Sequence, residues 1–588
     1  MNHLYNAKSV NIVIIIIVSF GVYANTLLNG FVYDDREQIL KNPWITDFQY
    51  IPDILFSPSW SFLEQYKHIK TNYYRPTMHL IYMAEYHIFG LKPWGWHLVN
   101  IVFHIINSLL VFTIATILIN KSQIQKPEST ILSPALLSAL LFATHPINTE
   151  VVAWIACIPE LSFTMFYLLS FYLYIKMQKA KENDKEGRLA SVYYIPSIIS
   201  FFLATLSKET ALTIPILLIV YDYFKEENNQ QIWLRNLKRY IPYGMVAIVY
   251  LLFRFYVLEG IAPKKPMHPY LNTFQYFINI FLLFIQYLKS LLLPINLSQF
   301  HLLNPAYSIL EIKALTSIFI TLFIPIIFYR LRKIDSLCLL SLFFIILPLL
   351  PVLYIPVLGI NTFAERYLYL PSVGFALLLS LGLKQFVTLN FKREISVWFL
   401  MGVLVIICLY SFGTVKRNSQ WKDDYILWKT AVERYPENYF AFMELGDIYL
   451  ERGLLDEAIV VLKEAIRTNT LRNHPVPRIL EVSRLNLVAA YYSKGLFGEA
   501  IEEYKEVIKA NPNSDRLIAS FQNAIKLAEK PSGISDIYSN LGNIYAITGL
   551  MDDAITYYEE ALRIAPDNPV ALHNIEVIRR IIHRKNPQ

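Results

Sequence analysis

Apolar runs long enough to cross a membrane recur along the first 415 residues and then stop. A transmembrane helix needs about 20 predominantly apolar residues. The first run, residues 9–28, follows Lys8 and has an unbroken β-branched centre at 12–18, so we interpret it as an uncleaved signal anchor; the alternative is a signal peptide cleaved after Ala24. Further runs lie near 96–118, 131–144, 151–175, 190–206, 210–224, 240–258, 273–294, 311–329, 336–358, 367–386 and 395–414.

Basic connections between these runs predict the orientation, because cytoplasmic loops collect Lys and Arg. They lie at 176–188, 235–239, 330–333 and 384–393. All four face the cytoplasm only if segment 273–294, which contains Gln286 and Lys289, is an interfacial or re-entrant helix. This layout has about eleven crossings, a first external loop at 29–95 and an external C-terminus. A crossing at 75–90 would change the parity.

After Trp421 the pattern changes to short amphipathic helices with small and aromatic residues in register. The clearest copy contains Leu541, Gly542, Tyr545, Gly549, Ala554, Tyr558, Ala561 and Pro566, and related copies surround Ala458 and Ala500. These positions are typical of the tetratricopeptide repeat. The sequence therefore predicts an all-α protein: a polytopic transmembrane helical bundle at 1–415, followed by a tetratricopeptide-repeat α-solenoid at 416–588.

Composition agrees with a membrane protein. The chain is 55% hydrophobic and only 17% charged, with a mean hydropathy of +0.37, whereas an average globular chain is roughly 25% charged. The first 415 residues hold 31 Lys and Arg against 22 Asp and Glu, and the remainder is nearly balanced. The basic excess belongs to the membrane part, so no nucleic-acid partner is implied. A cytosolic enzyme and a disordered protein are also excluded.

The adjacent carboxylates Asp34 and Asp35 come directly after the first span. Near a hydrophobic helix, low dielectric and mutual repulsion raise the pKa of one carboxyl toward the range of a general base for a hydroxyl acceptor. The plain structural alternative is that acidic residues simply end a helix at the membrane surface.

Several short external turns also carry charges next to apolar helices. They contain His145, Glu150, Lys208, Glu209, Glu365 and Arg366, and Arg75 lies in the first external loop. Charges at membrane depth are costly and often mark a functional cavity. A departing phosphate needs positive charge, and Lys208 and Arg366 suit that role. The alternative is that these pairs only anchor helix ends.

In sequence order, these motifs resemble the GT-C membrane glycosyltransferases, specifically the transmembrane and tetratricopeptide-repeat O-mannosyltransferases and their bacterial relatives. The matching motifs are Tyr33-Asp34-Asp35, Tyr74-Arg75-Pro76, His97-Leu98-Val99-Asn100 with His104, Phe142-Ala143-Thr144-His145-Pro146 with Glu150 and Trp154, Leu206-Ser207-Lys208-Glu209-Thr210, and Glu365-Arg366-Tyr367-Leu368-Tyr369-Leu370-Pro371-Ser372. One departure is Ala156-Cys157 before Glu160, where relatives usually carry a Gly-Arg-like pair.

The resemblance implies transfer of a mannose-like sugar from a polyprenyl-phosphate donor to a hydroxyl, with Ser or Thr of a protein as the expected acceptor. Asp34 and Asp35 are then the catalytic residues. Arg366, Lys208, Arg75 and His145 bind the donor phosphate, and Glu150, Glu209 and Glu365 support them. Stretches 47–56 and 75–90 look like juxtamembrane helices. We expect no cofactor and no metal ligands, although some members of the superfamily need a divalent metal.

Other functions remain open from the sequence. The acceptor could be a lipid or a glycan, and the repeats could bind an assembly partner instead of an acceptor protein. A non-enzymatic repeat scaffold needs one anchor rather than many spans, and a transporter favours charges in mid-span. The Ile-, Lys-, Asn- and Tyr-rich usage suggests an AT-rich bacterial genome. We therefore expect a bacterial plasma (inner) membrane protein, in contact with membrane lipids, whose repeats are extracytoplasmic.

Overall fold

The computed structural model describes residues 2–63, 73–119, 133–183, 188–225, 237–260, 268–302, 304–334, 336–358, 361–388, 393–511, 516–517, 520, 531–547 and 549–585. Lys185, Arg235 and Lys392 of the basic connections lie outside these residues, as does part of the first external loop. Within them the chain is helical without a strand, and His301 and Phe363 form an isolated bridge. The described residues divide into two compact units, Met1–Asp423 and Asp424–Gln588.

The first unit is the predicted helical bundle. Its longer helices are α1 (Asn2–Tyr23), α3 (Pro76–Phe89), α4 (Pro93–Ile119), α5 (Pro134–Thr144), α7 (Ile158–Asn183), α8 (Arg188–Ser207), α9 (Ile214–Lys225), α11 (Ile241–Leu258), α12 (Thr273–Leu292), α13 (Ile312–Ile334), α14 (Ser336–Leu349), α15 (Tyr369–Thr388) and α16 (Arg393–Asn418). Two short helices, α2 (Ile51–Phe56) and α6 (Thr149–Ala153), lie in the connections.

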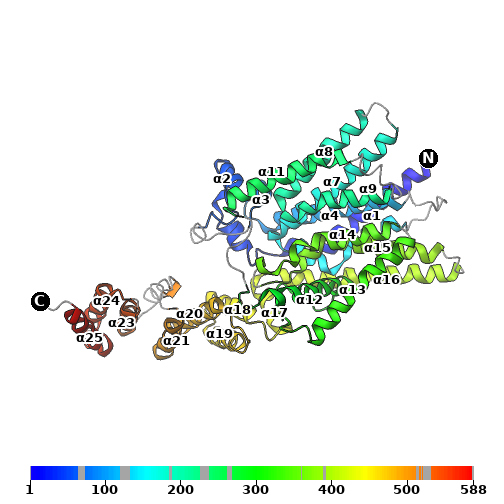
Figure 1. Cartoon of the computed structure of the whole chain (residues 1–588). Helices are drawn as coiled ribbons and strands as arrows, with labels where there is room; N and C mark the ends of the chain where they lie inside the picture. Colours follow the sequence, from blue (N-terminus) through cyan, green and yellow to red (C-terminus); the bar gives the residue numbers. More distant parts are fainter. Residues whose placement is uncertain are drawn as a thin grey trace. The chain divides into compact units, whose positions relative to one another are not determined.

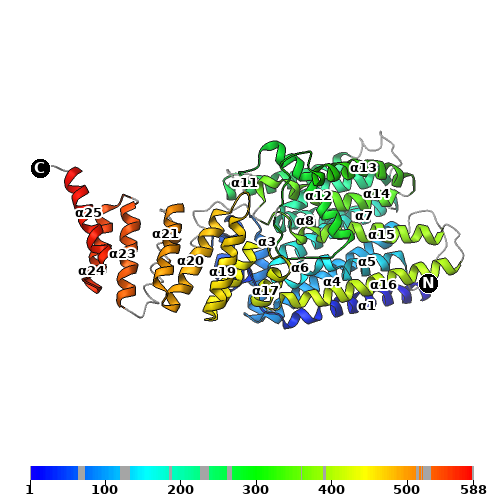
Figure 2. The same ribbon diagram turned by 90° about the horizontal axis from the view of Figure 1, so that it is seen from below.

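Helices α1, α4, α5, α15 and α16 pack side by side, and α7 pairs with α8 beside α9, α11 and α14 (Figures 1 and 2). Local sequence explains the start of α5. Pro134 is the first residue of α5, where a fixed φ suits the helix and no amide hydrogen is needed. The hydroxyl of Ser133 caps the same end by accepting from the Leu136 amide at 3.2 Å.

This is a multi-pass membrane protein. Among the described residues, seven helices are long and apolar enough to cross a membrane, or eight if the bent pair Pro134–Thr144 and Pro146–Ala153 counts as one span. This is fewer than the eleven crossings expected, partly because the runs at 210–224 and 336–358 form helices of only 12 and 14 residues. Segment 273–294, which the sequence excluded from the crossings, forms a helix that qualifies as a span.

The second unit is a stack of helix pairs. It contains α17 (Asp424–Arg434), α18 (Tyr439–Glu451), α19 (Leu455–Thr470), α20 (Pro477–Lys494), α21 (Phe497–Ala510), α23 (Pro531–Ile547), α24 (Met551–Ile564) and α25 (Pro569–Lys585). The predicted small positions Ala458, Ala500, Ala554 and Ala561 are fully buried. Gly446 faces Leu462 so closely that a Cβ at this glycine would lie 2.5 Å from that side chain. The small residues therefore allow the paired helices to approach each other.

Candidate active site

The acidic loop, which carries Asp34 and Asp35, begins directly after the short 3-10 helix η1 (Ala24–Leu28) that extends the first span. Tyr33 adopts a left-handed backbone conformation, with φ of 54°. Such a conformation strains a non-glycine residue and persists only where its surroundings hold it. Here the Tyr33 ring packs on Trp154, with ring centroids 5.4 Å apart. The loop is therefore held in one shape immediately before its two carboxylates.

The two carboxylates have different environments. Asp35 is fully buried and accepts hydrogen bonds from the backbone amides of Val32 at 2.9 Å and Ala156 at 2.8 Å. Asp34 is half-buried, and its carboxylate has no hydrogen-bond partner among the residues that the structure describes. Burial raises the pKa of Asp34 to about 6, although the Arg366 guanidinium counteracts part of that rise. Asp34 thus has the environment of a general base, whereas Asp35 holds the loop.

Arg366 lies in the short 3-10 helix η12 (Glu365–Leu368), just before α15. Its guanidinium Nη1 donates to Glu150 Oε1 at 2.7 Å, and its backbone amide donates to Glu150 Oε2 at 3.0 Å. The guanidinium also lies 5.6 Å from the centre of the Trp154 ring. Because Glu150 binds both the backbone and the side chain of Arg366, it sets the direction of this cation.

Lys208 is the first residue after α8, and its ammonium forms a buried ion pair with Glu160 in the first turn of α7. The distance from Nζ to Oε1 is 2.9 Å, and the two side chains are 4% and 5% exposed. The same ammonium lies 4.5 Å from the centre of the Tyr367 ring. Tyr367, adjacent to Arg366 in sequence, therefore brings two cations to one aromatic side chain.

Arg75 joins the same group of charges from the start of α3. Its guanidinium lies 3.5 Å from the Glu209 carboxylate, which Arg254 approaches to 4.0 Å on its other oxygen. Burial alone would raise the pKa of Glu209, but the neighbouring cations, Arg75 first, outweigh it and lower that pKa to about 2. Glu209 is therefore a permanent anion that keeps Arg75 in place.

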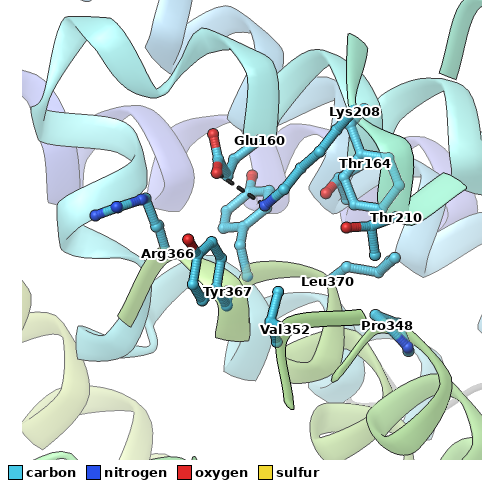
Figure 3. A pocket seen from close by; sticks show the side chains of 11 residues that line it. Glu160, Thr164, Lys208, Thr210, Pro348, Val352, Arg366, Tyr367 and Leu370 are labelled. Atoms are coloured by element: carbon cyan, nitrogen blue, oxygen red, sulfur yellow. Dashed lines mark hydrogen bonds and ion pairs between the residues drawn. The ribbon is translucent and has the colours of Figure 1, made fainter. Parts of the chain in front are cut away.

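A small pocket lies between these pairs, with a cavity volume of about 10 Å³. Its lining comes from α7, from Lys208 and the short 3-10 helix η8 (Glu209–Thr213), from the end of α14 and the turn after it, and from η12 and the start of α15: Glu160, Phe163, Thr164, Lys208, Thr210, Pro348, Val352, Arg366, Tyr367, Tyr369 and Leu370. Figure 3 shows Lys208 reaching Glu160 across the middle of this pocket, beside the Tyr367 ring. The lining combines the charged side chains of Glu160, Lys208 and Arg366 with apolar residues.

Two predicted site residues, His145 and Glu365, form their hydrogen bonds outside this group of charges. His145 accepts from the Ile147 amide on Nδ1 and donates to the Leu291 carbonyl from Nε2, so both ring nitrogens bind backbone. Glu365 accepts from the Ser298 amide at 2.6 Å and from His301 at 2.9 Å. Phosphate binding by His145 stays a prediction that this geometry does not favour, and Glu365 supports the turn that carries Arg366.

Sequence reasoning gave no role to Glu160 or to Tyr367. Glu160 could have been found, because a carboxylate in an apolar helix requires a cation and Lys208 was available. The sequence also gave no role to Glu85 in α3. Its carboxyl is buried near Asp35, and its pKa is raised by burial and by Asp35. In the described part of the chain, no three His, Cys, Asp or Glu side chains form a group suited to a metal ion.

The fold and the site define a class: a multi-pass helical membrane protein with buried ion pairs at its helix ends beside an acidic loop, followed by tetratricopeptide repeats. Family models of the tetratricopeptide repeat match residues 427–475, 483–514 and 535–568, which confirms the predicted repeats.

The homologues of this chain are protein O-mannosyl-transferases. Human protein O-mannosyl-transferase TMTC3 is 25% identical over an alignment 605 residues long. This alignment covers 96% of this chain and 61% of that protein. Human protein O-mannosyl-transferase TMTC4 is 27% identical over 487 residues, covering 75% of this chain and 64% of that protein. The chain thus spans less than two thirds of the length of these relatives.

Among solved structures, the crystal structure of ArnT from Cupriavidus metallidurans bound to undecaprenyl phosphate aligns with 82% of this chain and 79% of its own, with a TM-score of 0.37 and 12% sequence identity. A similarity at this level does not extend to function.

Proposed function

We propose that this chain is a membrane glycosyltransferase that moves a mannose-like sugar from a polyprenyl-phosphate donor to a hydroxyl acceptor. The expected acceptor is Ser or Thr of a protein, on the extracytoplasmic face of a bacterial plasma membrane. The names of the homologues support the reaction class. The observation that carries the proposal is the half-buried Asp34 carboxyl within electrostatic reach of Arg366, a cation that lines one pocket together with Lys208.

Asp34 is the general base in this proposal. Its carboxylate removes the proton from the acceptor hydroxyl as the oxygen attacks the anomeric carbon of the sugar. A base with a pKa near 6 is deprotonated at neutral pH and still accepts a proton efficiently in the transition state. Asp35 holds the loop through its two backbone hydrogen bonds. Both residues thus contribute, but only Asp34 touches the acceptor.

The bond from the anomeric carbon to the phosphate oxygen breaks as the new glycosidic bond forms, so the configuration inverts. Polyprenyl phosphate leaves with the electron pair and needs cations rather than a proton donor. Arg366 and Lys208 line the pocket where this charge develops, and Arg75 lies beside it. A guanidinium can bind two phosphate oxygens at once, which favours Arg366 as the main contact.

The repeats have a separate task in this proposal. Stacked helix pairs offer an extended surface for a polypeptide, so the second unit would select a protein acceptor while the first unit performs the transfer. The polyprenyl chain of the donor would lie among the membrane lipids that surround the first unit.

The test is sugar transfer by the purified full-length protein in detergent, supplied with radiolabelled polyprenyl-phosphate sugars and an acceptor extract. We expect Asp34→Asn to lower the rate by about 100- to 10,000-fold, as loss of a general base does. Asp35→Asn should also lose activity, but with reduced folding stability, because the two backbone amides bind different oxygens of Asp35 and asparagine has only one oxygen. Asp53→Asn is the matched control, since Asp53 is an exposed carboxylate in α2, within the same 29–95 segment as Asp34 and Asp35.

Full activity of Asp34→Asn would overturn the assignment of the base. No transfer from any donor by folded wild-type protein would overturn the enzyme and favour a membrane-anchored repeat scaffold. Label recovered in a lipid or a glycan instead of protein would keep the reaction but replace the acceptor.

A further inference from the structure

The last residues of the first unit form a junction segment, residues 415–422, immediately before the first repeat helix α17. It comprises the end of α16, the 3-10 helix η13 (Ser419–Trp421) and Lys422. Arg417, Asn418 and Trp421 are buried. A simple tether to a second domain would be expected to be exposed and polar, so burial of this segment indicates a further role.

The junction segment is hydrogen-bonded along its length to the first span and the start of the acidic loop. The bonds are Asn25 Nδ2 to the Val415 carbonyl (3.0 Å), Asn418 Nδ2 to the Val22 carbonyl (2.9 Å), Asn29 Nδ2 to the Asn418 carbonyl (3.1 Å) and the Gly30 amide to the Lys422 carbonyl (2.8 Å). Gly30 lies only a few residues before Asp34, so the junction segment directly holds the chain that enters the acidic loop.

Arg417 connects the junction segment to the turns that carry Glu150 and Arg366. Its Nη1 donates to the Pro146 carbonyl at 3.1 Å, at the start of the turn that leads to Glu150. Its Nη2 lies 2.5 Å from Glu365 Oε2, and Glu365 directly precedes Arg366. One buried guanidinium therefore joins both sides of the Glu150–Arg366 ion pair.

Trp421 completes the connection through aromatic packing. Its ring stacks on Trp154, with centroids 5.7 Å apart and an interplanar angle of 19°. Trp154 in turn contacts the Tyr33 ring and the Arg366 guanidinium. Trp421 is 1% exposed, so a smaller side chain would leave a space into which Trp154 could move. Any such movement would release both Tyr33, next to the base, and the cation.

We propose that the junction segment is a positioning element of the active site, in which Trp421 and Arg417 fix the position of the Asp34 loop relative to the turn that carries Arg366. This inference rests on the proposed function. Neither residue touches the substrate; Trp421 acts on Tyr33 and Arg366 through Trp154, and Arg417 acts on the Arg366 turn through Glu365. The segment that leads into the repeats therefore also sets the catalytic geometry.

The experiment compares Trp421→Leu with Trp428→Leu and Trp421→Phe in the full-length protein. Trp428 lies in α17 of the second unit and is equally buried, so its replacement controls for the loss of a large core side chain. The first readout is amide hydrogen exchange, which needs no turnover. We expect Trp421→Leu alone to speed exchange of the Gly30 amide and of residues 32–40.

The second readout is sugar transfer at saturating donor and acceptor across a range of pH. We expect Trp421→Leu to lower kcat by ~10- to 100-fold, since a displacement of about 1 Å in a site has effects of that size. The groups that influence Asp34 are Arg366 and Glu37. Displacement of Arg366 should therefore move the acidic limb of the kcat profile to higher pH. Trp421→Phe should retain the limb and most of the rate, and Trp428→Leu should leave the limb unchanged.

Unchanged exchange at Gly30 and residues 32–40 in Trp421→Leu would overturn the inference, whether or not the protein transfers sugar. An equal exchange change in Trp428→Leu would overturn it too, because the effect would then be general loosening. A wild-type protein that transfers no sugar would overturn the proposed function, and the exchange result would still decide whether the junction segment holds the acidic loop. A shifted acidic limb in Trp421→Leu alone supports both proposals.

Discussion

Replacing Glu160 by leucine would leave the Lys208 ammonium buried without its carboxylate. The two atoms are 2.9 Å apart, and their side chains are 5% and 4% exposed, so water cannot compensate for the lost partner. Removing one member of a buried ion pair costs about 3–5 kcal/mol, most of it the desolvation of the remaining charge. We expect a loss of this size for Glu160→Leu, and a similar loss for Lys208→Met.

The double variant Glu160→Leu/Lys208→Met separates stability from function. Replacing both members by apolar side chains of similar size is often neutral, so the double variant should be more stable than either single variant. The measurement is the unfolding midpoint of the detergent-solubilised protein, followed by circular dichroism, for the wild type and all three variants. Sugar transfer should stay low in all three, because Lys208→Met and the double variant lack the Lys208 cation and Glu160→Leu lacks the carboxylate that positions it. If the two single losses simply add in the double variant, Glu160 and Lys208 do not depend on each other and the reasoning fails.

Two further predictions concern the base and the repeats. With the pKa of Asp34 at about 6, the base form is lost as pH falls, so kcat should be constant above neutrality and roughly tenfold lower at pH 5; a flat profile between pH 5 and 8 would show that Asp34 is not the base. In the repeats, Gly446→Ala should destabilise by about 1–3 kcal/mol, because its Cβ would lie 2.5 Å from Leu462. Gly498→Ala, with nothing within 4 Å of the new atom, should be neutral or slightly stabilising in the same unfolding measurement.

The repeats and the helical membrane bundle could be read from the sequence because each depends on local pattern. The small positions of the repeats and the apolar runs are visible without knowing which helices are neighbours. The number of spans was less accessible, since the same apolar content forms either a long helix or a short one such as α9 or α14.

The charged residues of the site were identifiable, but their partners were not. Glu150 and Arg366 are 216 positions apart, and only the packing of their helices brings them together. The difference between Asp34 and Asp35 was hidden for the same reason: the Ala156 amide that binds Asp35 belongs to a distant turn. His145 looked like a free cation because no local pattern shows that its ring binds backbone on both sides.

Arg366, Lys208 and Arg75 are each bound to a carboxylate of their own. The three pairs together are consequently close to electrically neutral, which lowers the cost of keeping these groups at the edge of a low-dielectric membrane. In the proposed reaction the departing polyprenyl phosphate carries more negative charge than the donor did. It must compete with Glu150, Glu160 and Glu209 for the same cations, and those carboxylates cannot diffuse away. In the proposed reaction, the ion pairs would therefore compete with the product for these cations and favour its release before the next turnover.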